Sequence, residues 1–74
     1  MKTIGKSVNF IYVTVKFRFI FKDDSTMETS YRGVSEVSNE HAVGLAWQKM
    51  ADDNFDRNLI SKTKSIEVIN INND

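Results

Sequence analysis

The chain has 74 residues, in which ten basic side chains balance ten acidic ones and neither cysteine nor proline occurs. A chain this short forms one domain, residues 1–74, and buries too little surface to enclose a deep active-site cleft. The lack of cysteine excludes disulfides, thiol catalysis and cysteine-based zinc sites, and it indicates a reducing compartment. The zero net charge argues against a dedicated nucleic-acid binder.

No targeting or membrane-spanning segment is expected. An apolar stretch follows Lys2, but Lys16 and Arg18 interrupt it and no small-residue cleavage pattern comes after them. The longest apolar run is also too short and too charged to span a bilayer. We therefore expect a cytoplasmic protein, either of a bacterium or of an infected bacterial host, with no membrane partner.

The first predicted strand covers residues 11–22, where side chains alternate between two faces. One face is wholly apolar: Ile11, Val13, Val15, Phe17, Phe19 and Phe21. The other face is mostly polar or charged: Tyr12, Thr14, Lys16, Arg18, Ile20 and Lys22. This pattern is typical of a long strand with one buried face.

A second, more polar strand follows in "TMETSYRG", after the turn formers of "KDDST". The apolar side chains of both strands share one face if the loop is Asp23-Asp24-Ser25 and Met27 lies opposite Phe21. The same register places Lys16 opposite Arg32 on the outer face. Like charges in that position repel each other, so we interpret the pair as a hint of an acidic partner.

Residues 39–54 have helical spacing, and Ser38 is a suitable N-cap. The predicted core face of this helix consists of Ala42, Val43, Ala46, Trp47 and Met50. The segment "DDNFDRN" is expected to be the frayed helix end and an exit loop. "KSIEVINI" predicts a third strand whose apolar residues change phase, which indicates either a β-bulge or a partly apolar second face, and "NND" is expected to be a tail.

These elements have the order β-β-α-β. Alternating chain directions bring the third strand antiparallel beside the first, so the strand order is 2-1-3 and the hydrophobic first strand is central. We therefore predict an α+β fold in which one helix covers one face of a three-stranded antiparallel sheet.

The sequence offers little support for catalysis or metal binding. His41 is the sole histidine, and no nucleophile lies at a telling spacing from it, so we expect a surface residue and no enzyme. The segment "DDNFDRN" places oxygen donors at alternate positions, as at the start of an EF-hand calcium loop. Arg57 stands where that loop needs glycine and Thr63 where it needs glutamate. We predict no metal site and no cofactor.

One side of the predicted helix is nearly uncharged and contains small residues: His41, Gly44, Gln48 and Ala51. Glycine inside a helix costs about 1 kcal/mol relative to alanine, and small residues permit close approach of another backbone. This side is a candidate surface for a partner protein or a homodimer. The alternative is a plain solvent-exposed face, since exposed apolar residues are common.

The outer face of the predicted sheet carries an aromatic residue among basic ones: Tyr12, Lys16, Arg18, Lys22 and Arg32. Such a face can bind an acidic protein surface, or nucleic acid through phosphate contacts and base stacking. The alternative is that alternate lysine and arginine residues keep an aggregation-prone strand soluble.

A hairpin, one helix and a closing strand in a chain of about this length resemble the layout of small phage-encoded inhibitors of bacterial defence systems, including some anti-CRISPR proteins. The resemblance covers the layout of most of the chain. It implies a stoichiometric protein that blocks a nucleic-acid-handling complex by covering its charged surfaces. We therefore expect a non-enzymatic protein-binding module; the alternative is a small nucleic-acid-binding protein that uses the basic sheet face.

Overall fold

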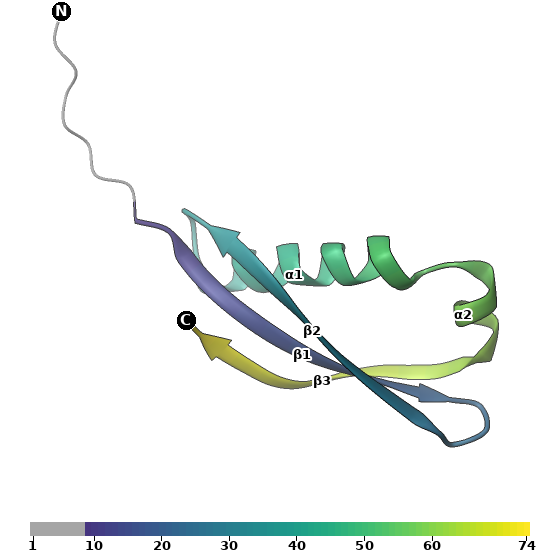
Figure 1. Ribbon diagram of the computed structural model, residues 1–74. Helices are drawn as coiled ribbons and strands as arrows, with labels where there is room; N and C mark the ends of the chain where they lie inside the picture. The colour runs from purple at the N-terminus through teal and green to yellow at the C-terminus, as the bar shows by residue number, and fades with distance from the viewer. Residues whose placement is uncertain (1–8) are drawn as a thin grey trace, which may run out of the picture.

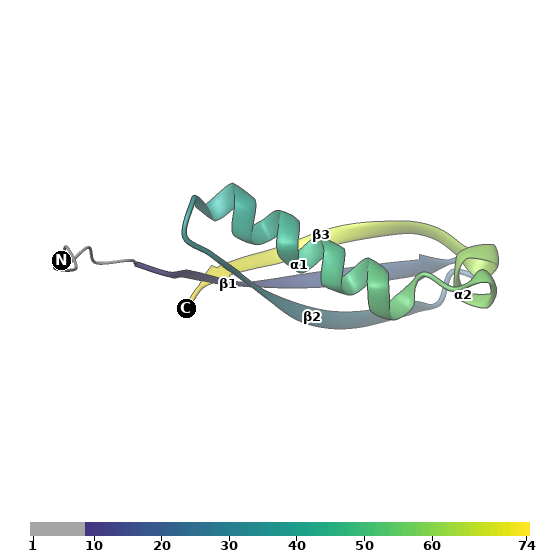
Figure 2. The same ribbon diagram turned by 90° about the horizontal axis from the view of Figure 1, so that it is seen from above.

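The computed structural model describes residues 9–74, which form a three-stranded antiparallel sheet with a helix on one face (Figure 1). The elements follow in the order β1 (Ile11–Phe21), β2 (Thr26–Ser35), α1 (Asn39–Asn54), α2 (Arg57–Lys62) and β3 (Thr63–Asn73). The strand order is β2-β1-β3, so the predicted α+β fold and topology are confirmed. Seen from above, α1 crosses the sheet obliquely and leaves the part of β3 nearest α2 to one side (Figure 2).

The core lies between β1 and α1. Four β1 side chains are fully buried, Val13, Val15, Phe17 and Phe19, and they pack against Ala42, Ala46 and Met50 of the helix. The two alanines let the helix approach the sheet closely. Trp47 packs edge-on against Phe17, with the ring centroids 4.9 Å apart, and still leaves 36% of its surface exposed. The predicted core face of the helix is therefore confirmed for Ala42, Ala46 and Met50, whereas Trp47 at its edge is partly exposed.

The predicted pairing of β1 with β2 was wrong by two residues. Lys16 lies opposite Ser30, and Arg18 lies opposite Glu28, so the expected pair of Lys16 with Arg32 does not form. Residues 22–25 lie between the two strands, so the loop has one residue more than the predicted Asp23-Asp24-Ser25 and begins earlier, at Lys22. Asp24 takes a positive φ of 69°, and the backbone N–H of Phe21 donates to the carbonyl oxygen of Ser25 at 2.9 Å. A residue in the left-handed region is common in short hairpin loops of this kind.

The helix α1 begins and ends where the sequence predicts, and Ser38 caps it by accepting from the N–H of His41 at 3.1 Å. Gly33 of β2 sets how closely this helix lies against the sheet. A Cβ atom at Gly33 would stand 1.7 Å from the carbonyl oxygen of Ala42, which is backbone and cannot move aside. Only glycine fits at this contact.

The segment after α1 differs from the prediction. Where an exit loop was expected, Asp56 caps a second helix, α2, by accepting from the N–H of Leu59 at 2.7 Å. The third strand runs on to Asn73, so "NND" is largely strand rather than tail. Of the two alternatives for this strand the bulge is confirmed, since Lys16 pairs with Asn70 and Phe17 with Val68, which leaves the residue between them unpaired with β1.

Within residues 9–74, no helix is long and apolar enough to cross a bilayer. The expectation about the stretch after Lys2 begins outside the described residues.

Candidate functional site

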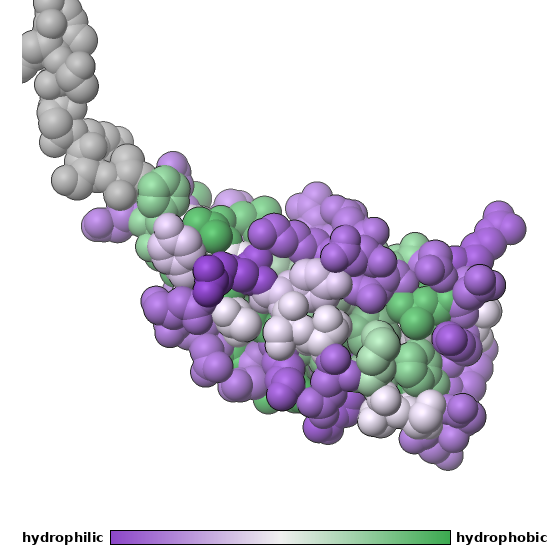
Figure 3. Space-filling view, in the orientation of Figure 1, coloured by the Kyte–Doolittle hydropathy of each residue, from purple (hydrophilic) through white to green (hydrophobic). Residues whose placement is uncertain are grey.

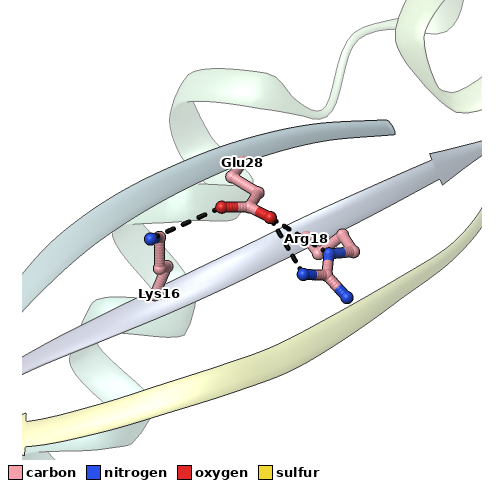
Figure 4. A network of polar contacts seen from close by, with 3 residues as sticks. All are labelled: Lys16, Arg18 and Glu28. Carbon is pink, nitrogen blue, oxygen red and sulfur yellow. Dashed lines mark hydrogen bonds and ion pairs between the residues drawn. The ribbon is translucent and has the colours of Figure 1, made fainter. Parts of the chain in front are cut away.

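The predicted basic surface lies on the sheet face opposite α1, where two of its cations converge on one carboxylate (Figure 4). Arg18 donates to Glu28 Oε2 from Nε at 3.2 Å and from Nη2 at 2.9 Å. Lys16 Nζ lies 3.4 Å from the other oxygen, Oε1. These hydrogen bonds, first from Arg18 and then from Lys16, hold the pKa of Glu28 below its ordinary value.

Arg32 and Tyr12 of this surface also lie close to partners within the chain. Arg32 Nε stands 3.0 Å from Asp74 Oδ2, and its guanidinium lies over the Tyr12 ring at 5.9 Å. Glu67 of β3 lies opposite Arg18 on the same face of the sheet. Lys22 lies in the exposed hairpin turn, apart from the strand residues. The outer face thus carries interspersed charges of both signs rather than a uniformly basic field.

The uncharged side of α1 is exposed as expected. His41, Gly44 and Gln48 lie at the surface, and Ala51 is partly buried. A Cβ atom at Gly44 would meet nothing within 4 Å among the described residues, so this glycine is not required by packing within the chain.

His41 is tied to the start of its own helix. Its Nδ1 lies 2.6 Å from the hydroxyl of Ser35, which is buried and accepts from the backbone N–H of Val37 at 2.9 Å. The hydroxyl therefore holds the chain between β2 and α1. We interpret this contact as a helix-entry cap, because the serine oxygen is enclosed by the backbone that it supports.

The sequence did not predict an apolar groove between the C-terminal half of α1, α2 and the beginning of β3. The groove has a volume of about 400 Å³ and its apolar lining consists of Phe19, Trp47, Phe55, Leu59, Ile60 and Ile66. Phe55 and Ile60 are 46% and 55% exposed, which is high for large apolar side chains. In the view of Figure 3, one hydrophobic area lies toward the end of the molecule that carries α2.

A second apolar feature, the β3 strip, consists of Val68 and Ile71. They lie opposite Phe17 and Val15, so they are on the helix-bearing face of the sheet. They are nevertheless 37% and 48% exposed. The sequence showed that the apolar residues of β3 change phase, but we expected the helix to cover this face.

The resemblance of "DDNFDRN" to a calcium loop has a structural explanation. Asp56 serves as the N-cap of α2, and Asn54 donates to the hydroxyl of Tyr31 at 2.9 Å. Across the part of the chain that the structure describes, no group of three His, Cys, Asp or Glu residues could hold a metal ion.

Comparisons with protein-family models, with curated proteins and with solved structures find no match to this chain.

Proposed function

We propose that this chain is a non-enzymatic protein-binding module that takes an apolar side chain of a partner protein into the groove between α1, α2 and β3. The observation that carries the proposal is the open groove itself, with Trp47 and Phe55 at its margins and Phe19 among its lining residues. A volume of about 400 Å³ lies within the range of about 300–1,000 Å³ that is usual for sites that bind small ligands.

The energetics favour a protein partner at this place. Burying an exposed large apolar side chain is worth about 1.5–3 kcal/mol, and aromatic residues are the ones that most often dominate binding energy. Trp47 is already held by its contact with Phe17, so little side-chain entropy is lost when a partner covers it.

We infer that the mixed charges of the outer sheet face help to select the partner protein and add little to the binding affinity. Lys16, Arg18 and Arg32 each lie beside a carboxylate of the same chain, so an acidic partner would have to displace Glu28 or Asp74. Charges of this kind set orientation and association rate more than affinity. The same pairing lowers the support for the alternative of nucleic-acid binding through this face.

By its layout, the module would act as a phage or mobile-element inhibitor that occupies a surface of a bacterial nucleic-acid-handling complex, in the cytoplasm of the host. Occupancy of a surface needs no reaction, which suits a chain with an open apolar groove.

The test is capture of a partner from bacterial lysate by the tagged protein, identified by mass spectrometry. Ile60→Asp places a charge in the groove, and Val37→Asp is the matched control because Val37 is 73% exposed and is not among the groove residues. The proposal expects the wild type and Val37→Asp to capture the same protein and Ile60→Asp to lose it, with circular dichroism unchanged. Equal capture by both variants would reject the groove.

A charge reversal of Lys16, Arg18 and Arg32 then separates the two surfaces. The groove proposal expects this variant to retain most of its capture at physiological salt. If the charge-reversed variant lost capture and Ile60→Asp retained capture, the partner would contact the outer face of the sheet instead of the groove.

A further inference from the structure

The two edges of the sheet are protected differently. At the β2 edge, α1 lies close against Gly33, and Lys49 of the helix donates to the carbonyl oxygen of Arg32 at 3.0 Å. At the other edge lies β3, with which no strand pairs on its outer side among residues 9–74. A long unpaired edge is a template for pairing with another strand, and proteins usually blunt it with charges, proline or a covering element.

Strand β3 has few of these protections. It is 11 residues long, and between Ser65 and Asn73 its single charged residue is Glu67. Proline does not occur in the chain. Beside the free edge, Val68 and Ile71 expose apolar surface on the helix-bearing face. The strand therefore offers backbone groups and apolar side chains at the same place.

The pairing with β1 determines how a second copy of β3 can fit. Val68 and Ile71 lie opposite Phe17 and Val15, which are two residues apart on β1 and so hold equivalent positions in the hydrogen-bond alternation. Val68 and Ile71 are three residues apart in sequence, but the extra residue at the bulge, Ile69, gives them the same place in the alternation. Their backbone groups therefore have the same orientation relative to the free edge of β3. They share a face, as opposed residues in an antiparallel pair must.

We propose that β3 pairs antiparallel with β3 of a second copy of this chain, with Val68 opposite the partner's Ile71 and Ile71 opposite the partner's Val68. The two-fold axis passes between Ile69 and Asn70. The β3 strip of each copy then continues into that of the other, and the two three-stranded sheets become one sheet of six strands.

This register also brings no like charges together. On the outer face, Glu67 comes opposite the partner's Asn72, so no like charges meet across the axis. An antiparallel arrangement brings the beginning of β3, with Lys64, toward the end of the partner strand, with Asp74. In the dimer, the apolar groove of each copy stays open, and the two grooves lie on the same face of the six-stranded sheet. The dimer does not depend on what the groove binds.

Light scattering and sedimentation test the dimer directly, since one chain has a mass of 8.5 kDa and the expected particle has twice that mass. Val68→Lys alone and Ile71→Glu alone each place a charge against an apolar side chain, twice per dimer. Each is expected to raise the dissociation constant at least about tenfold, because a charge is buried without a partner. The double variant Val68→Lys, Ile71→Glu is expected to recover most of the loss, since opposite charges then face each other across the axis.

Cross-linking tests the register, because the chain has no cysteine of its own. Opposed residues in an antiparallel pair have Cα atoms about 4.5–5.5 Å apart, which a disulfide spans. A mixture of Val68→Cys and Ile71→Cys proteins should cross-link under mild oxidation. A mixture of Val68→Cys and Val37→Cys proteins is the matched control and should not.

A wild type that stays monomeric at millimolar concentration would overturn the proposal, as would a dimer that neither single variant weakens. A double variant no better than the singles, or equal cross-linking in the control mixture, would overturn the register. The groove variant Ile60→Asp should leave the dimer unchanged, so failure of the dimer and failure of groove binding are seen separately.

Discussion

Arg18 of β1 and Glu28 of β2 lie opposite each other, and the guanidinium donates to Glu28 Oε2 from both Nε and Nη2. Opposite charges at opposed positions favour this register of the hairpin over its neighbours, because a slip of two residues would separate them. Lys16 contacts the second oxygen of the same carboxylate, so one acidic residue serves both cations of β1.

The first prediction concerns the pH dependence of this contact. The pKa of Glu28 is lower in the folded chain than its ordinary value, because Arg18 and Lys16 donate to its charged form. The contribution of Glu28 to stability is therefore fully present above the pKa that its carboxyl has in the unfolded chain, and it is lost as the pH falls through the lower pKa of the folded chain. Measured by urea unfolding, the free energy of unfolding of Glu28→Gln should be lower than that of the wild type at pH 7, and the difference should become smaller under acid conditions.

The effect is expected to be small, because Glu28 is exposed and solvent screens exposed ion pairs. Glu67→Gln is the matched control, since Glu67 is also opposite Arg18 but makes no hydrogen bond to it among the described contacts. A difference between the wild type and Glu28→Gln that stays constant down to pH 2 would contradict the assignment.

The second prediction concerns the hairpin turn. Asp24 holds a φ of 69°, a conformation that costs β-branched residues most. Asp24→Val should lower the free energy of unfolding by about 1–2 kcal/mol, whereas Asp24→Gly should stay within about 0.5 kcal/mol of the wild type. Both variants remove the ion pair with Lys64, so comparing them isolates the backbone effect. Equal losses in the two variants would mean that the ion pair, not the turn, is responsible.

This turn explains why the face of each strand residue could be predicted and the register could not. Alternation assigns side chains to faces correctly, and Phe17 is buried while Lys16 faces outward. A slip of two residues leaves every side chain on its face, so alternation cannot detect it. The register depends instead on Asp23, which accepts from the N–H of Ser25 at 2.9 Å, and on the left-handed Asp24.

The groove could not be predicted because it depends on how α1 lies across the sheet. The sequence indicated which side of α1 is apolar, and Ala42 and Ala46 are indeed buried. The helix axis, however, depends on the backbone contact of Gly33 with Ala42, which the periodicity of apolar side chains within each element does not specify. The short helix α2 was missed because six residues form a helix only with help from a cap and from packing.

The third prediction tests the contact at Gly33. Gly33→Ala should cost about 3 kcal/mol of unfolding free energy, at the upper end of the usual range for overpacking, because a Cβ atom there overlaps the Ala42 carbonyl and the helix must move away. Thermal unfolding measures the loss. If Gly33→Ala were as stable as the wild type, the close approach of α1 to β2 would be wrong.

The fourth prediction uses the other described glycine. Gly44→Ala should raise the unfolding free energy by about 0.5–1 kcal/mol, because alanine is the better helix former and nothing among the described residues obstructs its Cβ. The same variant reports on the uncharged side of α1. Loss of partner capture or of the dimer with Gly44→Ala would show that another backbone packs against this glycine.

The last prediction concerns the entry to α1. Ser35→Ala removes a buried acceptor and leaves the backbone N–H of Val37 without its partner, so we expect a loss of about 1–3 kcal/mol. His41→Ala should cost less, because His41 is exposed and its removal leaves the bond between Ser35 and Val37 in place. Hydrogen exchange at the Val37 amide should therefore speed up in Ser35→Ala and change little in His41→Ala. Equal losses of stability with equal exchange rates would mean that the histidine contact, rather than the serine cap, holds the chain between β2 and α1.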